Sequence, residues 1–146
     1  MELEFKFNKT ALATMAKKIE SIGGKAKQQA LKALESATDK LLEESVKRCP
    51  IDEGFLQQSH DRKIEKSGSL EEAKGTVFIP ANSPAADYAI YMHELEYNLG
   101  PQSQAKQAAQ PGITVGNKYL ERAFEENKKT FLLYIEDALR KALAHA

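Results

Sequence analysis

The sequence predicts an α+β fold, in which long helices pack on a small antiparallel β-sheet within a single domain. Two long stretches, at about 25–48 and about 118–144, carry apolar side chains at helical spacing. Between them, residues 60–66 and 74–80 are typical of the two strands of a β-hairpin. The length, 146 residues, fits one domain that can bury a core without disulfides or metals.

The chain begins with a strand pattern. Residues 2–8 alternate apolar and charged side chains, and this period of two predicts a short strand with one buried face. Asn8 or Thr10 can then cap a helix whose apolar stripe reaches Ile22. The pair Gly23-Gly24 stops or kinks that helix.

The second helix, at about 25–48, carries a leucine-rich stripe and would be roughly 35 Å long. Pro50 pushes Cys49 out of the helical region and ends the helix. In the hairpin, residues 60–66 are polar, as in an edge strand, and Pro80 closes the strongly β-forming second strand.

The last third of the chain holds two less regular segments and a long helix. Residues 88–94 are apolar and aromatic, and their periodicity does not separate a strand from a short helix. Residues 98–117 are rich in Gly, Pro, Gln and Ala, which predicts a long flexible loop. In the final helix, Glu125-Glu126 come early and Arg140-Lys141 late, which suits the helix dipole.

Charge and cysteine content narrow the classes of function. Lys and Arg number 21 and so do Asp and Glu, so the net charge is zero and nucleic-acid binding as a main role is disfavoured. Weak self-repulsion suits a protein that assembles with its own copies. The single cysteine, Cys49, excludes an internal disulfide and fits a reducing cytoplasm. Neither a signal peptide nor a membrane span of roughly 20 apolar residues is expected.

Motifs for catalysis or metal binding are incomplete. The stretch from His93 through Glu94 to Tyr97 lacks the second histidine of a metalloprotease helix, four residues after the first. Asp52 is better explained as a turn residue whose carboxylate bonds backbone N–H groups after Pro50. Cys49 is expected to be a buried thiol at a helix end. We therefore predict no catalytic residues, no metal site and no cofactor.

A cluster of aromatic residues offers a candidate interface. Tyr88, Tyr91 and Tyr97, with Glu94 among them, could form part of the core or a surface for a partner, since tyrosine is apolar with a polar tip.

Three segments, in order, resemble the tailed-phage head–tail joining proteins, also called neck or tail-completion proteins. The first runs from Cys49 to Ser59 and is similar to that family's Pro-Val-Asp-Thr-Gly-x-Leu-x-x-Ser pattern after a long helix, with Ile51 for Val and Glu53 for Thr. Its fold-signature turn consists of Pro50, Asp52, Gly54, Leu56 and Ser59.

The other two segments follow at matching places. Residues 88–94 resemble a Tyr-Ala-x-x-x-Glu stretch, although the glycine that commonly follows closely in the family is here as distant as Gly100. Residues 119–124 resemble the Phe-Leu-x-x-Ala start of a C-terminal helix. The resemblance covers roughly residues 25–144.

The resemblance implies a structural virion protein without catalysis. Subunits of that family form a ring, often six-fold, between the head connector and the tail tube, so the implied partners are other copies of the chain and the connector and tail-tube proteins. Assembly would take place in the cytoplasm of the bacterial host, without membrane or sequence-specific nucleic-acid binding. Two alternatives stay open: a helical protein-binding adaptor, and a small metal-dependent hydrolase that uses His93 and Glu94.

Overall fold

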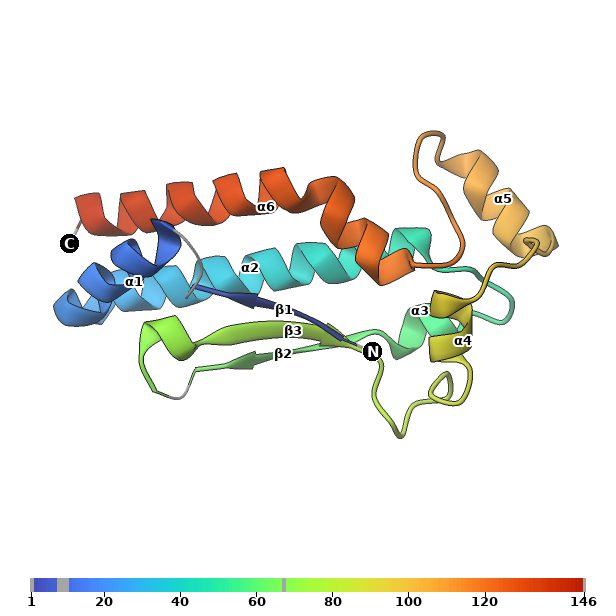
Figure 1. Ribbon diagram of the computed structural model, residues 1–146, viewed down its shortest axis with the longest axis horizontal. Coiled ribbons are helices and arrows are strands. Elements are labelled where there is room, and N and C mark those ends of the chain that lie inside the picture. The colour runs from blue at the N-terminus through green and yellow to red at the C-terminus, as the bar shows by residue number, and fades with distance from the viewer. Residues whose placement is uncertain (1, 8–10, 67, 146) are drawn as a thin grey trace. The chain divides into compact units, whose positions relative to one another are not determined.

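The structure is a computed structural model that describes residues 2–7, 11–66 and 68–145 (Figure 1). The expected helix caps Asn8 and Thr10 lie outside the described residues. The elements follow one another as β1 (Glu2–Lys6), α1 (Ala11–Ile22), α2 (Gly24–Arg48), α3 (Phe55–Ser59), β2 (Asp61–Glu65), the 3-10 helix η1 (Leu70–Glu72), β3 (Lys74–Phe78), α4 (Ala89–Glu94), α5 (Pro101–Ala109) and α6 (Tyr119–Ala144).

The predicted fold class is confirmed. Long helices accompany a small antiparallel sheet of three strands, in the order β1-β3-β2. The hairpin predicted at 60–66 and 74–80 is β2 and β3, which are neighbours in the sheet. The three helices predicted from apolar stripes are α1, α2 and α6, and α2 ends before Pro50 as expected.

The chain forms two compact units. Unit 1 contains Leu41–Asp61 and Val77–Glu126, and therefore α3, α4 and α5. Unit 2 contains Glu4–Lys40, Arg62–Thr76 and the chain from Asn127 onward, and therefore α1, η1 and most of the sheet. The helices α2 and α6 contribute residues to both units.

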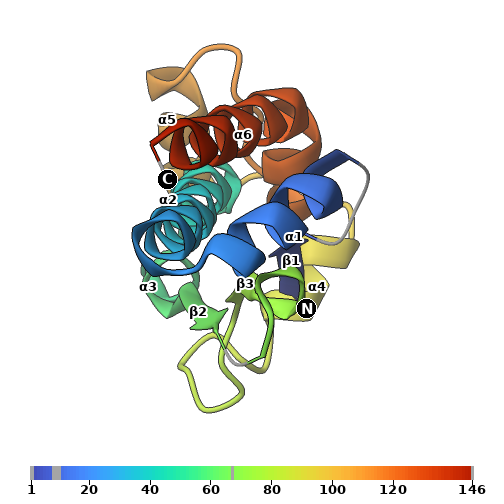
Figure 2. The same ribbon diagram turned by 90° about the vertical axis from the view of Figure 1, so that its left-hand side faces the viewer.

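In unit 2, helices cover one side of the sheet. The helices α1, α2 and α6 lie on the same side of the strands in two perpendicular views (Figures 1 and 2). The ring of Phe5 on β1 meets Phe131 of α6 edge-on, with centroids 5.5 Å apart. The core of this unit also contains the fully buried side chains of Phe7, Ile19, Leu34 and Leu139.

A glycine brings the central strand close to α2 in unit 2. A Cβ on Gly75 would lie 1.9 Å from the hydroxyl oxygen of Thr38, so only glycine fits there without displacement. The Thr38 hydroxyl donates a 2.7 Å hydrogen bond to the carbonyl of Leu34, and Thr38 is fully buried. The glycine and the threonine therefore fix how β3 packs on the helix.

The corner between α1 and α2 also depends on glycine. Gly23 and Gly24 have φ values of +67° and +56°, in the left-handed region, which ends α1 as the sequence predicted. Cβ atoms added at either glycine would meet nothing within 4 Å. Across the corner, the Lys27 ammonium of α2 lies 3.0 Å from a carboxylate oxygen of Glu20 in α1, and Glu20 also accepts from Leu70 N at 2.9 Å.

Two short helices and one longer helix correct or complete the sequence prediction. Residues 98–117, predicted as a flexible loop, contain α5, which starts with Pro101 in its first turn. The ambiguous segment 88–94 is largely the helix α4, and the junction after Pro50 contains the short helix α3. Among the described residues, none of the helices combines the length and the apolar character needed to span a membrane.

Candidate functional site

The carboxyl end of α2 is the structural anchor of unit 1. A helix leaves its last carbonyl groups without intrahelical partners, and the segment 106–116 supplies donors for them. The bonds are Lys106 Nζ to Val46 O (2.5 Å) and to Cys49 O (2.6 Å), the Gln110 side-chain amide to Lys47 O, and Gly116 N to Arg48 O (2.9 Å). The segment predicted as a flexible loop thus caps α2.

The helix α5 docks on this end through polar side chains. Ser103, Lys106, Gln107 and Gln110 follow the spacing i, i+3, i+4 and i+7, so they share one face of the helix. The Gln107 side chain donates to Ile113 O (2.6 Å) and accepts from Val115 N (2.7 Å), which holds the chain after α5 in place. A polar stripe therefore replaces the apolar stripe of an ordinary packed helix.

Lys106 and Cys49 share a buried setting. The Lys106 ammonium also donates to the side-chain oxygen of Gln57 at 2.5 Å, and burial lowers the pKa of Lys106. Burial raises the pKa of the Cys49 thiol to about 11. Cys49 is thus the buried helix-end thiol that the sequence predicted, in a neutral and unreactive form.

The junction after α2 is tied to α5 by a hydroxyl group. Ile51 N donates to Ser103 Oγ (2.8 Å), and Ser103 Oγ donates to Ile51 O (3.0 Å). The prediction that Asp52 satisfies backbone donors after Pro50 is wrong, because Asp52 is exposed and forms no hydrogen bond within the described chain. The hydroxyl of Ser103, 52 positions further along the chain, accepts from the backbone N–H of Ile51 instead. The residue preferences of local turns cannot predict a partner at that distance.

Gly54 makes the turn that starts α3. Its φ of +88° is left-handed, and its carbonyl accepts a 3.0 Å bond from Gln58 N. The turn directs Leu56 into the core, where it is 4% exposed, and leaves Phe55 42% exposed. The glycine prediction is confirmed at this position.

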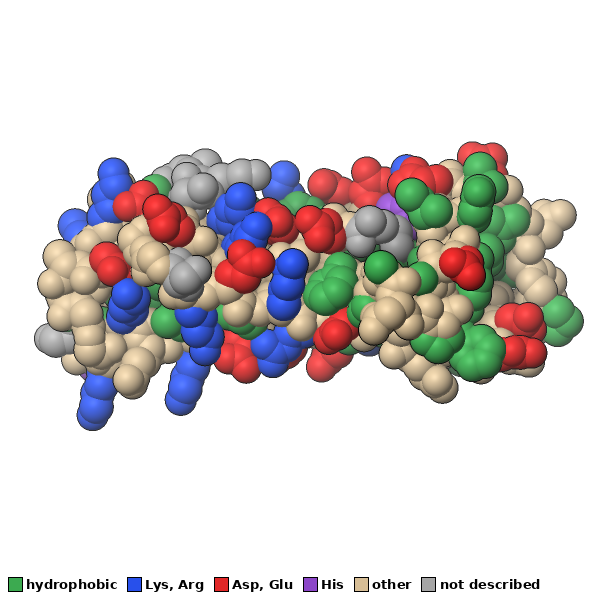
Figure 3. Space-filling model, turned by 90° about the horizontal axis from the view of Figure 1, so that it is seen from below, with side chains coloured by type: hydrophobic (Ala, Val, Ile, Leu, Met, Phe, Trp, Pro, Cys, Tyr) green, Lys and Arg blue, Asp and Glu red, His purple; other side chains and the backbone are tan. Residues whose placement is uncertain are grey.

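A groove opens between this junction and the chain around the start of α5. Its volume is about 810 Å³. The lining residues come from the junction, the start and end of α4 and the start of α5: Pro50, Ile51, Asp52, Glu53, Gly54, Phe55, Leu56, Pro84, Tyr88, Met92, Tyr97, Asn98, Leu99, Gly100, Pro101, Gln102 and Ser103. Hydrophobic side chains gather over this part of unit 1 (Figure 3). We call the groove lined by these residues the junction groove.

The junction groove is apolar with an acidic rim. Asp52 and Glu53 are its only charged lining residues, and neither forms an ion pair within the described chain. Burial, together with the carboxylates of Glu53 and Asp52, raises the pKa of Tyr88. Tyr88 and the two carboxylates line the same groove, which therefore combines negative charge with aromatic surface.

The four predicted interface residues separate into two groups. Tyr88 and Tyr97 line the junction groove, and the Tyr97 hydroxyl donates to Met92 O at 2.7 Å. Tyr91, which is 60% exposed, and Glu94 lie outside it on α4. Ile90 and Leu95, at the start of α4 and just after its end, are exposed apolar residues as well, and we call these two residues and Tyr91 the α4 patch. Whether these surfaces bind a partner stays a prediction.

Sequence reasoning missed several groove residues, Phe55, Met92 and Leu99 among them. One signal for Phe55 was present: Phe55 and Leu56 are adjacent on a short helix, so both cannot face the core. No comparable signal marked Leu99, whose place depends on the docking of α5.

His93 and Glu94 hold α4 against the start of α6. His93 Nε2 accepts from Glu121 N at 3.4 Å, in the first turn of α6, and the backbone carbonyl of His93 accepts from Lys118 N at 2.6 Å. His93 Nδ1 lies 3.0 Å from a carboxylate oxygen of Glu94. Both ring nitrogens thus have structural partners. Across the described ranges, no group of three or more His, Cys, Asp or Glu side chains could hold a metal ion.

His60 sits in a second buried polar contact of unit 1. Its Nδ1 lies 2.9 Å from Leu56 O, and because a carbonyl can only accept, Nδ1 carries the proton. Nε2 then accepts from the Ser45 hydroxyl at 2.7 Å. Burial lowers the pKa of both His60 and His93. Their rings contact the fully buried Tyr119, whose hydroxyl donates to Ala89 O at 2.9 Å.

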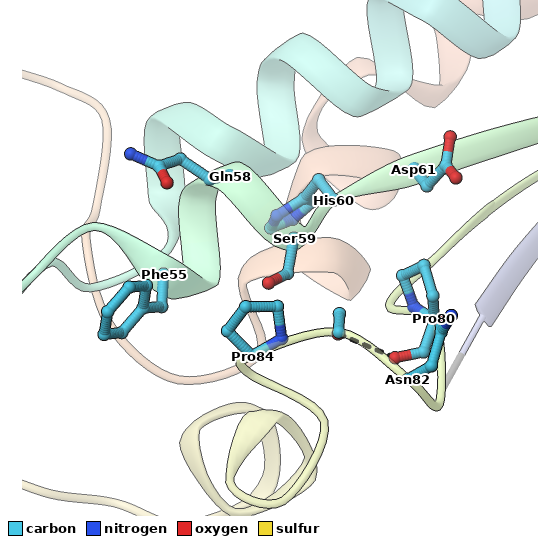
Figure 4. Close-up of a pocket in the computed structure, with 9 residues that line it drawn as sticks. Phe55, Gln58, Ser59, His60, Asp61, Pro80, Asn82 and Pro84 are labelled. Carbon is cyan, nitrogen blue, oxygen red and sulfur yellow. Dashed lines mark hydrogen bonds between the residues drawn. The ribbon is translucent and has the colours of Figure 1, made fainter.

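A smaller pocket of about 360 Å³ adjoins the junction groove, since Phe55 and Pro84 line both (Figure 4). Ser59, the last residue of the fold-signature turn, lies here, and its buried hydroxyl has no hydrogen-bond partner among the described residues. The Ser83 hydroxyl donates to Pro80 O at 2.6 Å, and both residues line this pocket. Ser59 therefore lines the smaller pocket, whereas the other four turn residues line the junction groove.

A comparison of the chain with protein-family models, curated proteins and solved structures gave no match.

Proposed function

We propose that the chain is a structural virion protein of a tailed phage or prophage, a subunit of a neck or tail-completion ring that joins the head connector to the tail. The observation that carries the proposal is the junction groove. Pro50, Asp52, Gly54 and Leu56 of the fold-signature turn line it. The residues that carry the family resemblance therefore help to form a groove that also holds the exposed rings of Phe55 and Tyr88, and grooves of this kind are typical of binding sites.

The charge of the chain supports protein partners. Its net charge is zero, and the groove presents two carboxylates and no basic side chain, so it would repel a phosphate backbone. A subunit of a ring around passing DNA needs contacts to other proteins, with little attraction for the DNA itself. The proposed partners are other copies of the chain and the connector and tail-tube proteins.

Deletion of the gene in the phage or prophage that encodes the chain tests this role. We expect electron micrographs of lysates to show filled heads and separate tails, with joined particles restored by a plasmid copy. Joined particles in normal numbers without the gene would reject the proposal.

Variants of the plasmid copy test the surface. Phe55→Ser in the junction groove and Tyr91→Ser in the α4 patch should lower the yield of joined particles, because each removes an aromatic side chain from a proposed binding surface. Both side chains are exposed and contribute little to the core, so the fold should be kept. Tyr134→Ser is the matched control, since Tyr134 is an exposed aromatic residue of α6 in unit 2. Equal yields for all three variants would show that neither surface takes part.

A helical protein-binding adaptor is the second candidate, favoured by the adjacent exposed residues Leu132 and Leu133 on α6. This function predicts a stable complex with one host protein and no copies of the chain on any particle. Immunogold labelling of purified particles separates the two candidates.

A further inference from the structure

We propose that the corner between α1 and α2 of one copy inserts into the junction groove of a second copy, with Ile22 as the apolar tip and Lys18 and Lys25 beside Asp52 and Glu53. This inference rests on the proposed function, because the contact would join neighbouring subunits of the proposed ring. It concerns two different surfaces of the same chain, so the contact is heterologous, the kind that builds rings.

The corner has the features of an inserting element. Ile22 is 51% exposed, which is unusual for an isoleucine, and it stands directly before Gly23 and Gly24. No atom lies within 4 Å of a Cβ added at either glycine, so space remains on this side of the turn for a partner. An exposed isoleucine at a turn of this kind can enter an apolar groove.

The charges around the tip are opposite to those of the groove. Lys18 precedes Ile22 by four residues and shares its face of α1, and Lys25 lies on the other side of the glycine pair. Both lysines are exposed and form no ion pair within the described chain. The first N–H groups of α2 add the positive end of a helix dipole at the same place.

The groove supplies the complementary set. Asp52 and Glu53 are exposed carboxylates without ion-pair partners in the described chain, and they line the same groove as Tyr88 and Phe55. A lysine ammonium that enters can meet a carboxylate and an aromatic face together, while Ile22 covers exposed apolar surface. Opposite charges across such a contact fix which surfaces meet.

Cysteine cross-linking of purified protein tests the contact. A chain with Ile22→Cys is mixed at high concentration with a size-tagged chain with Phe55→Cys and is mildly oxidised. We expect a disulfide-linked dimer of the two different chains. The native Cys49 should react little, because it is buried and its pKa is raised to about 11.

The matched control pairs Phe55→Cys with Leu133→Cys, since Leu133 is 55% exposed and Ile22 is 51% exposed. A cross-link yield for Ile22→Cys no higher than for Leu133→Cys overturns the proposal. Far-UV circular dichroism of each variant confirms that the exposed substitutions leave the fold unchanged.

Charge reversal adds a second, independent readout. Asp52→Lys with Glu53→Lys in the Phe55→Cys chain should reduce the cross-linking rate by at least about tenfold through like-charge repulsion. Adding Lys18→Glu and Lys25→Glu to the Ile22→Cys chain should restore it. A rate that does not respond to either change contradicts the proposed pairing.

The outcomes separate this contact from the proposed function. Cross-linking together with normal particles in the gene deletion would keep the contact and reject the neck role. Unjoined heads and tails in the deletion without cross-linking would keep the neck role and reject the contact.

Discussion

Gly54 is required for its backbone conformation. Its φ is +88°, and a Cβ there would meet only Gln58 Nε2, at 3.5 Å. A left-handed conformation costs an L-residue about 1–2 kcal/mol, and a β-branched side chain tolerates it poorly. We predict that Gly54→Val lowers the free energy of unfolding by at least about that amount, measured by urea denaturation.

The control for this substitution is Gly100→Ala. Gly100 has a φ of −74°, in a region open to any residue, and no atom lies within 4 Å of its added Cβ. Its replacement should leave stability unchanged or raise it slightly, by up to about 1 kcal/mol. If Gly54→Val proved as stable as Gly100→Ala, the left-handed turn would not be a requirement of the fold.

The two buried histidines of unit 1 make stability depend on pH. Burial lowers the pKa of both His60 and His93 below the value of 6.5 that each has when exposed. The unfolded chain therefore binds more protons as the pH falls. Their contribution to stability is complete above about pH 6.5 and is lost as the pH falls through the lowered pKa values.

Urea denaturation at about pH 7.5 and about pH 5.5 measures this effect, in a range above that in which carboxylates titrate. We expect a smaller free energy of unfolding at the lower pH. His93→Gln should reduce the difference, because glutamine keeps a hydrogen-bond acceptor and does not titrate. A difference that is absent in the unmodified protein would contradict the expectation.

At the scale of elements, the sequence predicted correctly those helices and strands that bury apolar side chains. The helices α1, α2 and α6 bury apolar faces, so their periodicity was visible, and alternation revealed β1. The helix α5 buries only Ser103, so a search for apolar periodicity finds nothing there. Its composition of Ala, Gln and Lys, after an initial proline, was the available signal.

The junction groove was only half predictable. One wall is the fold-signature turn, which the sequence motif marked. The other wall, Asn98 to Ser103, reaches the turn through bonds between residues more than 50 positions apart, such as Ile51 with Ser103. Local sequence patterns carry no information on pairings between such distant residues. The place of Phe55 in the groove therefore becomes clear only when both walls are known.

Lys106 should be essential for the docking of α5. Lys106→Met keeps the length of the side chain and removes its donors, which leaves Val46 O, Cys49 O and Gln57 Oε1 without this partner. Loss of a partner from buried polar groups costs about 1–3 kcal/mol each at most sites. We predict a lower free energy of unfolding and faster hydrogen exchange at the backbone amides of α5.

Lys40→Met is the control, because Lys40 is an exposed lysine of α2 with no ion pair within the described chain. It should leave both measurements close to those of the unmodified protein. Similar effects of the two substitutions would show that the cap formed by Lys106 contributes nothing specific.

At the scale of the whole molecule, α2 and α6 should couple the two units during unfolding. Each helix is continuous and contributes residues to both units, so melting one unit would break helices that the other needs. We predict one cooperative transition.

The tyrosines make this measurable. Tyr88, Tyr91, Tyr97 and Tyr119 belong to unit 1, so tyrosine fluorescence reports mainly on that unit, whereas far-UV circular dichroism reports on all helices. The two signals should give the same midpoint in urea. Separate midpoints would show that the units unfold independently.

The paired hydrogen bonds between Ile51 and Ser103 also set the width of the junction groove. Both residues line it, one on each wall, and a single hydroxyl holds the walls together at this point. The thickness of a segment that can enter is thus limited in part by this side chain. Substitution of Ser103 would alter which partners fit, and such a change in selectivity could arise while every residue that contacts the partner's charges stays the same.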